Sequence, residues 1–224
     1  MSLKLAVFVS GGGSNLQSII DKVEAGILDA EIRLVLSNSP DAYGLERAKK
    51  HGIESVAISH KDYAERENFD RAMIAAVHKA KADTVILAGF MRLLTPMFIS
   101  EFPLRILNIH PALLPSFAGI HGQGDAADYG VKLSGCTVHF VDEKMDHGPV
   151  IIQAAVPVVP GEDGKSLGER ILKFEHRIYP QAIQWLAEAR LSVQGRHVFL
   201  RDTGAEKAVL DTPGLVNPEL EKGF

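Results

Sequence analysis

The fold is decided by residues 5–17, which read Leu5-Ala6-Val7-Phe8-Val9-Ser10-Gly11-Gly12-Gly13-Ser14-Asn15-Leu16-Gln17. The first five are a continuous apolar run, too short for a helix, that ends in glycines; this predicts a buried strand. Ser14 and Gln17 have the spacing of a capping box, and apolar residues then recur at helical intervals. The stretch therefore predicts a strand that passes through a glycine turn into the start of a helix.

The same alternation continues to about residue 110. Further strands are expected at 32–36, 55–58, 84–88 and 106–109, and helices at 43–51, 65–81 and 95–102. The strand at 84–88 is the most apolar, so we expect it near the centre of the sheet. Apolar strands separated by helices predict an α/β fold with a doubly wound, mostly parallel, Rossmann-like sheet.

After residue 134 the pattern changes to an antiparallel C-terminal portion. Strands at 136–141 and 150–159 are expected to pair as a hairpin, and a second hairpin is expected at 191–200. Between them a helix is expected to begin at a capping box, Ser166 to Glu169, and to be kinked or broken at Pro180. We expect a single domain over residues 1–200, with halves at 1–110 and 111–200, and a loosely held tail at 201–224.

Composition excludes several classes of function. The net charge is −4 without a run of basic residues, which argues against nucleic acid or an anionic membrane as a partner. No apolar stretch is long enough to span a membrane, and the N-terminus lacks the apolar core of a signal peptide. One cysteine gives no disulfide framework, and nine histidines without a ligand spacing predict no metal site. These features predict a soluble cytoplasmic domain whose oligomeric state stays open.

The glycine run at 11–13 is a candidate phosphate site. Glycines allow close approach of a ligand to the backbone, and N–H groups at a helix start attract phosphate. A plain tight turn explains the pattern equally well. Leu16 stands where a dinucleotide fingerprint needs Gly or Ala, and the P-loop Gly-Lys-Ser/Thr is missing. The second strand ends in Leu36-Ser37-Asn38, with no acidic residue placed to hold an adenosine ribose. A phosphate monoester is therefore favoured over NAD or ATP.

Two further segments carry candidate catalytic groups. Asn108 and His110 lie two residues apart in a strand, so they project to the same side, and Pro111 keeps His110 extended. A histidine that only caps the strand end is the alternative. Asp146 precedes a glycine–proline turn and could orient an imidazole. For that segment alone, an exposed acidic hairpin tip is the favoured interpretation.

Together the segments resemble the phosphoribosylglycinamide formyltransferases, a branch of the folate-dependent formyltransferases, over residues 4–200. The motifs that carry the resemblance are Ser10-Gly11-Gly12-Gly13-Ser14-Asn15-Leu16-Gln17, Ser37-Asn38 with Ala42-Tyr43-Gly44-Leu45-Glu46-Arg47-Ala48, Leu87-Ala88-Gly89-Phe90-Met91-Arg92, Asn108-Ile109-His110-Pro111, Asp146 with Gly148-Pro149-Val150-Ile151, and Glu175-His176 with Ile178-Tyr179-Pro180. The resemblance implies transfer of a formyl group from 10-formyltetrahydrofolate, as co-substrate, to the amine of glycinamide ribonucleotide in purine synthesis, without a metal.

The resemblance also assigns site residues. Asn108, His110 and Asp146 would be catalytic: Asn108 would donate to the oxyanion, and His110, charged by Asp146, would stabilise the intermediate. Gly12, Gly13, Ser14 and Asn15 would hold the substrate phosphate, and Glu175 its sugar. The folate would contact Arg66, Met91, Arg92, Leu93, Leu94, Asn108, Val141 and Asp142, the last two at the start of a loop that runs to Gly148.

The chain departs from the family pattern at two places. His147 replaces a small residue after the aspartate, and Gly122-Gln123-Gly124-Asp125 has an extra glycine and no second histidine. No substrate contact is therefore assigned to Gln123. Methionyl-tRNA formyltransferase would need a C-terminal RNA-binding domain, for which the tail is too short. A formyltetrahydrofolate hydrolase and a non-catalytic module that binds a phosphate ligand through the glycine run remain as alternatives.

Overall fold

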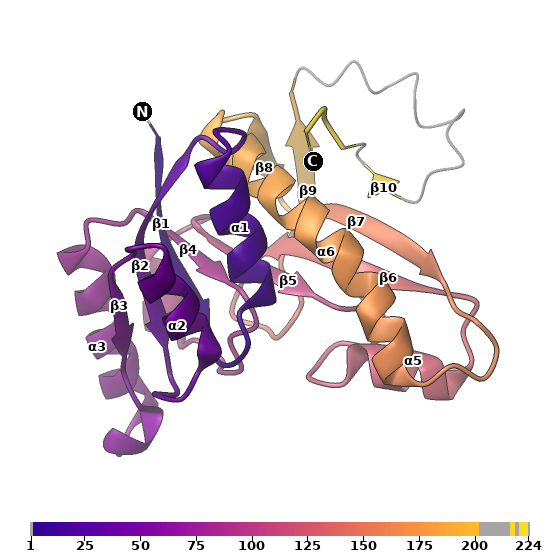
Figure 1. Cartoon of the computed structure of the whole chain (residues 1–224), viewed down its shortest axis with the longest axis horizontal. Coiled ribbons are helices and arrows are strands. Elements are labelled where there is room, and N and C mark those ends of the chain that lie inside the picture. Colours follow the sequence, from indigo (N-terminus) through magenta and orange to yellow (C-terminus); the bar gives the residue numbers. More distant parts are fainter. Residues whose placement is uncertain (1, 202–215, 218–219, 224) are drawn as a thin grey trace. The chain divides into compact units, whose positions relative to one another are not determined.

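The computed structural model describes residues 2–201, 216–217 and 220–223, and its contacts divide the chain into two compact units. The first unit comprises Met1–Asn108 with Val141–Glu143, and the second comprises Ile109–Phe140 with Lys144–Phe224. Figure 1 shows the elements of both units coloured along the sequence. Most of the tail predicted at 201–224 lies outside the described residues.

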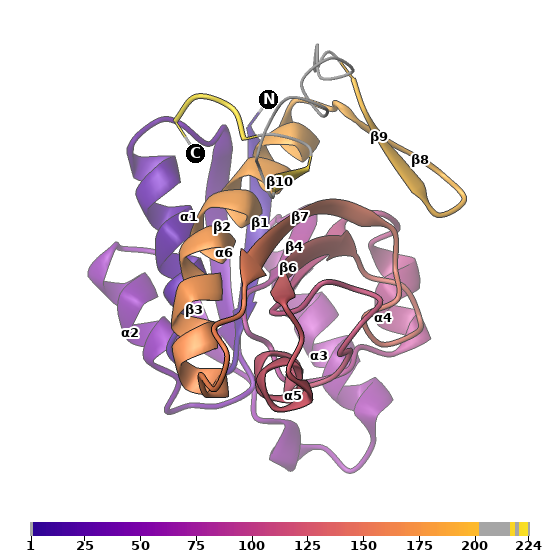
Figure 2. The ribbon, with the colours of Figure 1, turned by 90° about the vertical axis from the view of Figure 1, so that its right-hand side faces the viewer.

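The first unit is built on parallel strands in the order β3-β2-β1-β4-β5. The strands are β1 (Leu3–Val9), β2 (Ala30–Ser37), β3 (Ser55–Ala57), β4 (Thr84–Leu87) and β5 (Ile106–His110). The helices are α1 (Ser14–Glu24), α2 (Tyr43–Lys50), α3 (Arg66–Lys79) and α4 (Pro96–Glu101), with a short 3₁₀ turn η1 (His60–Asp62). Figure 2 shows α1 and α2 on one face of these strands and α3 and α4 on the other. The doubly wound parallel sheet predicted from the sequence is confirmed.

Apolar side chains from β1, β2 and β4 form a core with α3 and α4. Phe8 of β1 lies at its centre, with ring centroids 5.3 Å from Phe90 and 5.8 Å from Phe98. Helix α3 buries Phe69, Met73 and Val77, which share one face because they are four residues apart. This packing fixes the ends of β1 and β4, where the glycine run and the segment after residue 88 begin.

A buried carboxylate joins α3 to the start of α4. Thr95 caps α4 and Pro96 is its first residue, within the range where the sequence predicts a helix. Asp70 of α3, 1% exposed, accepts hydrogen bonds of 2.7 Å from both the backbone N and the Oγ1 of Thr95. The contact also fixes the end of the 91–94 segment.

We expect Asp70→Ala to lower the free energy of unfolding by about 2–4 kcal/mol, because it leaves two buried donors of Thr95 without their acceptor. Urea unfolding followed by circular dichroism measures the change. Asp41→Ala, which removes an exposed carboxylate of the same unit, is the control and should change stability by less than about 0.5 kcal/mol. Equal stability of the two variants would contradict this role for Asp70.

The second unit has an antiparallel sheet. Strands β6 (Leu133–Phe140) and β7 (Val150–Pro157) pair as predicted, and β10 (Val216–Asn217) pairs with β7. Helix α6 (Gly164–Ala187) packs on both long strands, and α5 (Gly122–Tyr129) packs on α6. Strands β8 (Leu191–Gln194) and β9 (His197–Leu200) form the second predicted hairpin, which projects beyond the end of α6 in Figure 2.

Several local predictions for the second unit are wrong. Helix α5 is absent from the elements that the sequence predicts. Gly124 and Gly164 let it meet α6 closely, since a Cβ on Gly164 would lie 2.6 Å from the Cα of Gly124. Helix α6 begins earlier than expected, because the carboxylate of Asp163 accepts from Ser166 N at 2.8 Å and forms the cap. Of the kink or break predicted at Pro180, the break does not occur, because the helix continues through this residue.

Within the described residues, none of the helices combines the length and the apolar character needed to cross a bilayer.

Candidate functional site

The glycine run leads from β1 directly into α1. Gly13 is the N-cap of this helix, in the left-handed conformation (φ 67°), and no side chain caps the helix. The capping box predicted at Ser14 is therefore wrong: Ser14 is the first helical residue. In the described part of the chain, the N–H groups of Gly11, Gly12, Gly13 and Ser14 donate to no protein acceptor. Such N–H groups at a helix start can bind an anion.

A cavity of about 300 Å³ opens beside this loop. It is lined by Ser10, Gly11, Gly12, Gly13, Ser14, Asn15, Ala88, Gly89 and Met91. The cavity therefore brings the residues predicted to bind phosphate next to the start of the segment predicted to bind folate. Both groups follow the carboxyl ends of neighbouring strands, β1 and β4, where ligands of parallel sheets bind.

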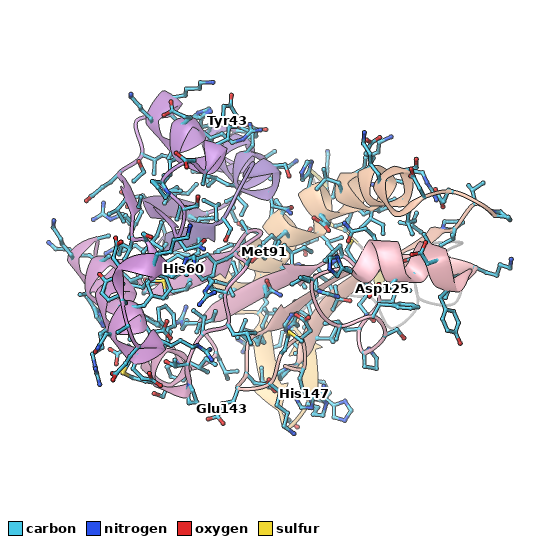
Figure 3. All side chains as sticks on the ribbon, turned by 90° about the horizontal axis from the view of Figure 1, so that it is seen from below. Tyr43, His60, Met91, Asp125, Glu143 and His147 are labelled. Atoms are coloured by element: carbon cyan, nitrogen blue, oxygen red, sulfur yellow. The ribbon has the colours of Figure 1, made fainter. Side chains whose placement is uncertain are left out.

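Hydrogen bonds hold the 91–94 segment in place. The Ser10 hydroxyl accepts from Met91 N at 2.7 Å and donates to Asn38 Oδ1 at 2.6 Å, while Asn38 Nδ2 lies 3.4 Å from His60 Nδ1. Arg66 donates from Nη2 to Leu93 O at 2.9 Å. Figure 3 labels Met91 and His60 in this region. The structure thus places Arg66 beside the 91–94 segment, where its side chain binds a backbone carbonyl.

The predicted folate residues of the first unit differ in exposure. Met91 and Leu93 are exposed (63% and 56%), whereas Leu94 is buried. Val141 packs against the core and donates from its N to Ile106 O at 2.9 Å; Arg92 and Asp142 are partly exposed. Exposed apolar side chains next to a cavity provide a surface on which a flat aromatic ring can pack.

Asn108 and His110 lie at the end of β5, and the strand geometry places them on one side. Asn108 is partly exposed and is paired in register with Leu87 of β4. His110 is 4% exposed and belongs to the second unit. An amide donor and an imidazole are thus carried by the same strand end, as the sequence predicts.

In the second unit, Asp146 lies beside His110. His110 Nδ1 is 3.5 Å from Asp146 Oδ2, and His110 Nε2 is 2.8 Å from Phe117 O. Because a carbonyl oxygen can only accept, Nε2 carries a proton. Nδ1 faces the Asp146 carboxylate, so the negative charge of Asp146 would attract a proton carried by Nδ1.

The aspartate is itself held in a fixed position. Asp146 has a left-handed backbone (φ 49°), rare for a residue other than glycine, and Gly119 N donates to its Oδ2 at 2.8 Å. A second histidine, His139 of β6, places Nε2 3.9 Å from Asp146 Oδ1. The sequence analysis missed His139 because it lies in an otherwise apolar strand. The signal that could have identified His139 is that it is the one titratable ring in that strand.

Glu175, predicted to bind the substrate sugar, lies on α6 and is 6% exposed. The pKa of the Cys136 thiol in β6 is raised well above its usual value, first by burial and secondly by the negative charge of Glu175. Glu175 therefore lies near Cys136. Cys136 is fully buried and lies in β6 as a small core residue.

His147, which departs from the family pattern, is bound to the β8–β9 hairpin. Arg196 donates from Nη2 to His147 O at 2.7 Å, and its Nη1 lies 3.1 Å and 3.2 Å from the two ring nitrogens. The His147 side chain extends outward (Figure 3). Among the described residues, no cluster of three or more His, Cys, Asp or Glu side chains could hold a metal ion.

Known proteins resemble the chain along most of its length. A family profile described as formyl transferase matches residues 3–183. Phosphoribosylglycinamide formyltransferase from Escherichia coli (strain K12) is 41% identical over 198 residues, which cover 88% of this chain and 93% of that protein. The structure of glycinamide ribonucleotide transformylase 1 from Symbiobacterium toebii has a TM-score of 0.87 and 45% identity, covering 89% of this chain and 94% of that chain.

A longer relative matches over a small part of its own length. The trifunctional purine biosynthetic protein adenosine-3 of Drosophila melanogaster is 48% identical over 185 residues, which cover 82% of this chain but 14% of that protein. The chain belongs to the formyl transferase family. The resemblance predicted from the motifs, and the Rossmann-like fold that it implies, are confirmed.

Proposed function

We propose that the chain transfers a formyl group from 10-formyltetrahydrofolate to the amine of glycinamide ribonucleotide, a step of purine synthesis. The observation that carries the proposal is the buried pair formed by Asp146 and His110, the latter on the strand that also carries Asn108. The names of the relatives that match over most of both chains support the same reaction.

The reaction needs no covalent enzyme intermediate. The amine lone pair forms a C–N bond with the formyl carbon, whose carbonyl oxygen becomes an oxyanion. The bond from that carbon to N10 of the folate then breaks, and the proton lost by the amine ends on N10 of tetrahydrofolate. The enzyme therefore has to stabilise one negative charge and move one proton.

The two groups at the end of β5 suit these tasks. The Asn108 amide can donate to the oxyanion, an interaction whose loss costs about 10²–10³ in rate at comparable sites. The His110 imidazolium, held by Asp146, adds a positive charge and can exchange a proton. Because Asp146 and Phe117 O already hold the His110 ring in place, the ring has to reorient little during the reaction.

Binding is divided among the predicted residues. The free N–H groups around Gly12, Gly13 and Ser14 suit a phosphate dianion, and Glu175 suits sugar hydroxyls. The folate is assigned to Arg66, the 91–94 segment, and Val141 with Asp142. A cytoplasmic location, and the absence of nucleic-acid and membrane partners, are part of the same proposal.

Release of tetrahydrofolate with and without glycinamide ribonucleotide tests the proposed function. Ribonucleotide-dependent release is expected. Equal release without the ribonucleotide would indicate a formyltetrahydrofolate hydrolase. No release under either condition would favour the phosphate-binding module, and either result would contradict the proposal.

A further inference from the structure

The start of helix α2 packs directly against the glycine run. Gly44 N donates to Gly11 O at 3.0 Å, and Arg47 Nε donates to Gly12 O at 2.8 Å. Two successive carbonyls of the loop are therefore bonded to one helix. We propose that Arg47 is a positioning residue: it orients the loop N–H groups that bind the substrate phosphate and does not itself touch the phosphate. The proposal rests on the phosphate role assigned to the loop under the proposed function.

The planarity of the peptide bond explains how the contact acts. In a trans peptide the carbonyl of one residue and the N–H of the next point in opposite directions. When Gly11 O and Gly12 O are held toward α2, the N–H groups of Gly12 and Gly13 are held away from it. Arg47 thereby fixes the direction of the second N–H, which a glycine backbone would otherwise leave free to rotate.

Helix α2 packs so closely against the glycine run and β1 that neither Gly13 nor Gly44 has room for a Cβ atom. A Cβ on Gly13 would lie 2.9 Å from Gly44 Cα, and a Cβ on Gly44 would lie 2.8 Å from Val9 Cγ2. The backbone of the glycine run thus lies directly against the backbone of α2 at Gly44, and Gly44 also packs against the side chain of Val9 at the end of β1. At this close contact, the side chain of Arg47 donates a hydrogen bond to a loop carbonyl, Gly12 O.

Arg47 is fixed on both sides. Its Nη1 donates to Gln17 Oε1 at 2.9 Å, and its guanidinium lies 5.0 Å from the centre of the Tyr43 ring. The two acceptors, Gly12 O and Gln17 Oε1, belong to the loop and to α1, so one planar fork joins the loop to the helix that it opens. A lysine has a single ammonium and no fixed fork, so it cannot reproduce this geometry.

Lys50 provides a matched control on the same helix. Its Nζ donates to the Tyr43 hydroxyl at 2.9 Å and lowers the pKa of Tyr43, so among the described residues its hydrogen bond goes to Tyr43 and not to a carbonyl of the loop. Tyr43 is labelled in Figure 3 on α2. Lys50→Gln therefore removes the same charge from α2 and leaves the loop carbonyls bonded.

The test compares Arg47→Gln, Arg47→Lys and Lys50→Gln with the wild-type chain. For both Arg47 variants we expect KM for glycinamide ribonucleotide to rise about tenfold or more, with kcat at saturation and KM for 10-formyltetrahydrofolate within about twofold of wild type. Binding of inorganic phosphate, followed by NMR of the Gly12 and Gly13 amides, should weaken in parallel. Lys50→Gln should match wild type in each measurement.

Three results would overturn the proposal. The first is an unchanged KM in Arg47→Gln. The second is a KM at the wild-type value in Arg47→Lys, which would mean that charge alone matters; this variant also decides the question if Arg47→Gln does not fold. The third is an equal rise in Lys50→Gln. Failure of the proposed function is distinct, because the wild-type chain would then show no ribonucleotide-dependent activity, while its phosphate binding could still be compared with that of the variants.

Discussion

Asp146→Asn is expected to lower kcat by about 10²–10⁴ while changing either KM by less than about threefold. The carboxylate faces His110 Nδ1 at 3.5 Å, and His110 Nε2 is already committed to Phe117 O. A neutral amide in place of the carboxylate removes the negative charge that favours the imidazolium, so the formyl oxyanion loses its positive partner. Steady-state kinetics with both substrates varied measure the effect.

Asp128→Asn is the control for this change. It removes an exposed carboxylate from α5 of the same unit and should leave kcat unchanged. Because Gly119 N also donates to Asp146, the variant's melting temperature should be recorded, so that a loss of folding is not taken for a loss of chemistry. Full turnover by a folded Asp146→Asn protein would remove the aspartate from the mechanism.

Gly13→Ala is expected to raise KM for glycinamide ribonucleotide by about a hundredfold. Its methyl group would lie 2.9 Å from Gly44 Cα, a backbone atom that cannot move without shifting α2. The loop must move instead, and the amides that surround the phosphate move with it. The substitution also places a residue with a Cβ at φ 67°, which costs about 1–2 kcal/mol of stability.

Gly26→Ala separates these two effects. Gly26 has nearly the same backbone conformation (φ 68°), but no atom lies within 4 Å of the position that an alanine methyl group would take there. We expect a similar loss of stability and an unchanged KM. Equal KM values for both glycine variants would show that the close approach of α2 to the loop has no part in substrate binding.

The alternation of strands and helices in the first unit is predictable because each element there has its own periodic or apolar signal. Ends of helices are less predictable: Gly13 and Asp163 take the cap positions that the sequence pattern assigns to Ser14 and Ser166, since the packing of the preceding turn decides which residue caps. Helix α5 escapes prediction because its two glycines serve a helix crossing that the local sequence does not reveal.

In the candidate site, too, features with a local sequence signal are predictable and features that depend on tertiary contacts are not. The side of the strand that Asn108 and His110 share is predictable from strand spacing, because both lie in one short segment. The contacts of Asp146 with Gly119 and His110 join residues 27 and 36 positions apart, so residue pattern alone favours an exposed hairpin tip. His139 belongs to no motif, and the motif that contains Arg47 does not indicate its partners, so tertiary contacts reveal what both residues touch.

The bond formed in the reaction is the most direct test of the proposed activity. The chain would be incubated with ¹³C-formyl-labelled 10-formyltetrahydrofolate and with glycinamide ribonucleotide labelled with ¹⁵N at the amine, and the product examined by NMR. We predict a formyl carbon coupled directly to the labelled nitrogen. Label recovered as formate, without that coupling, would contradict formyl transfer.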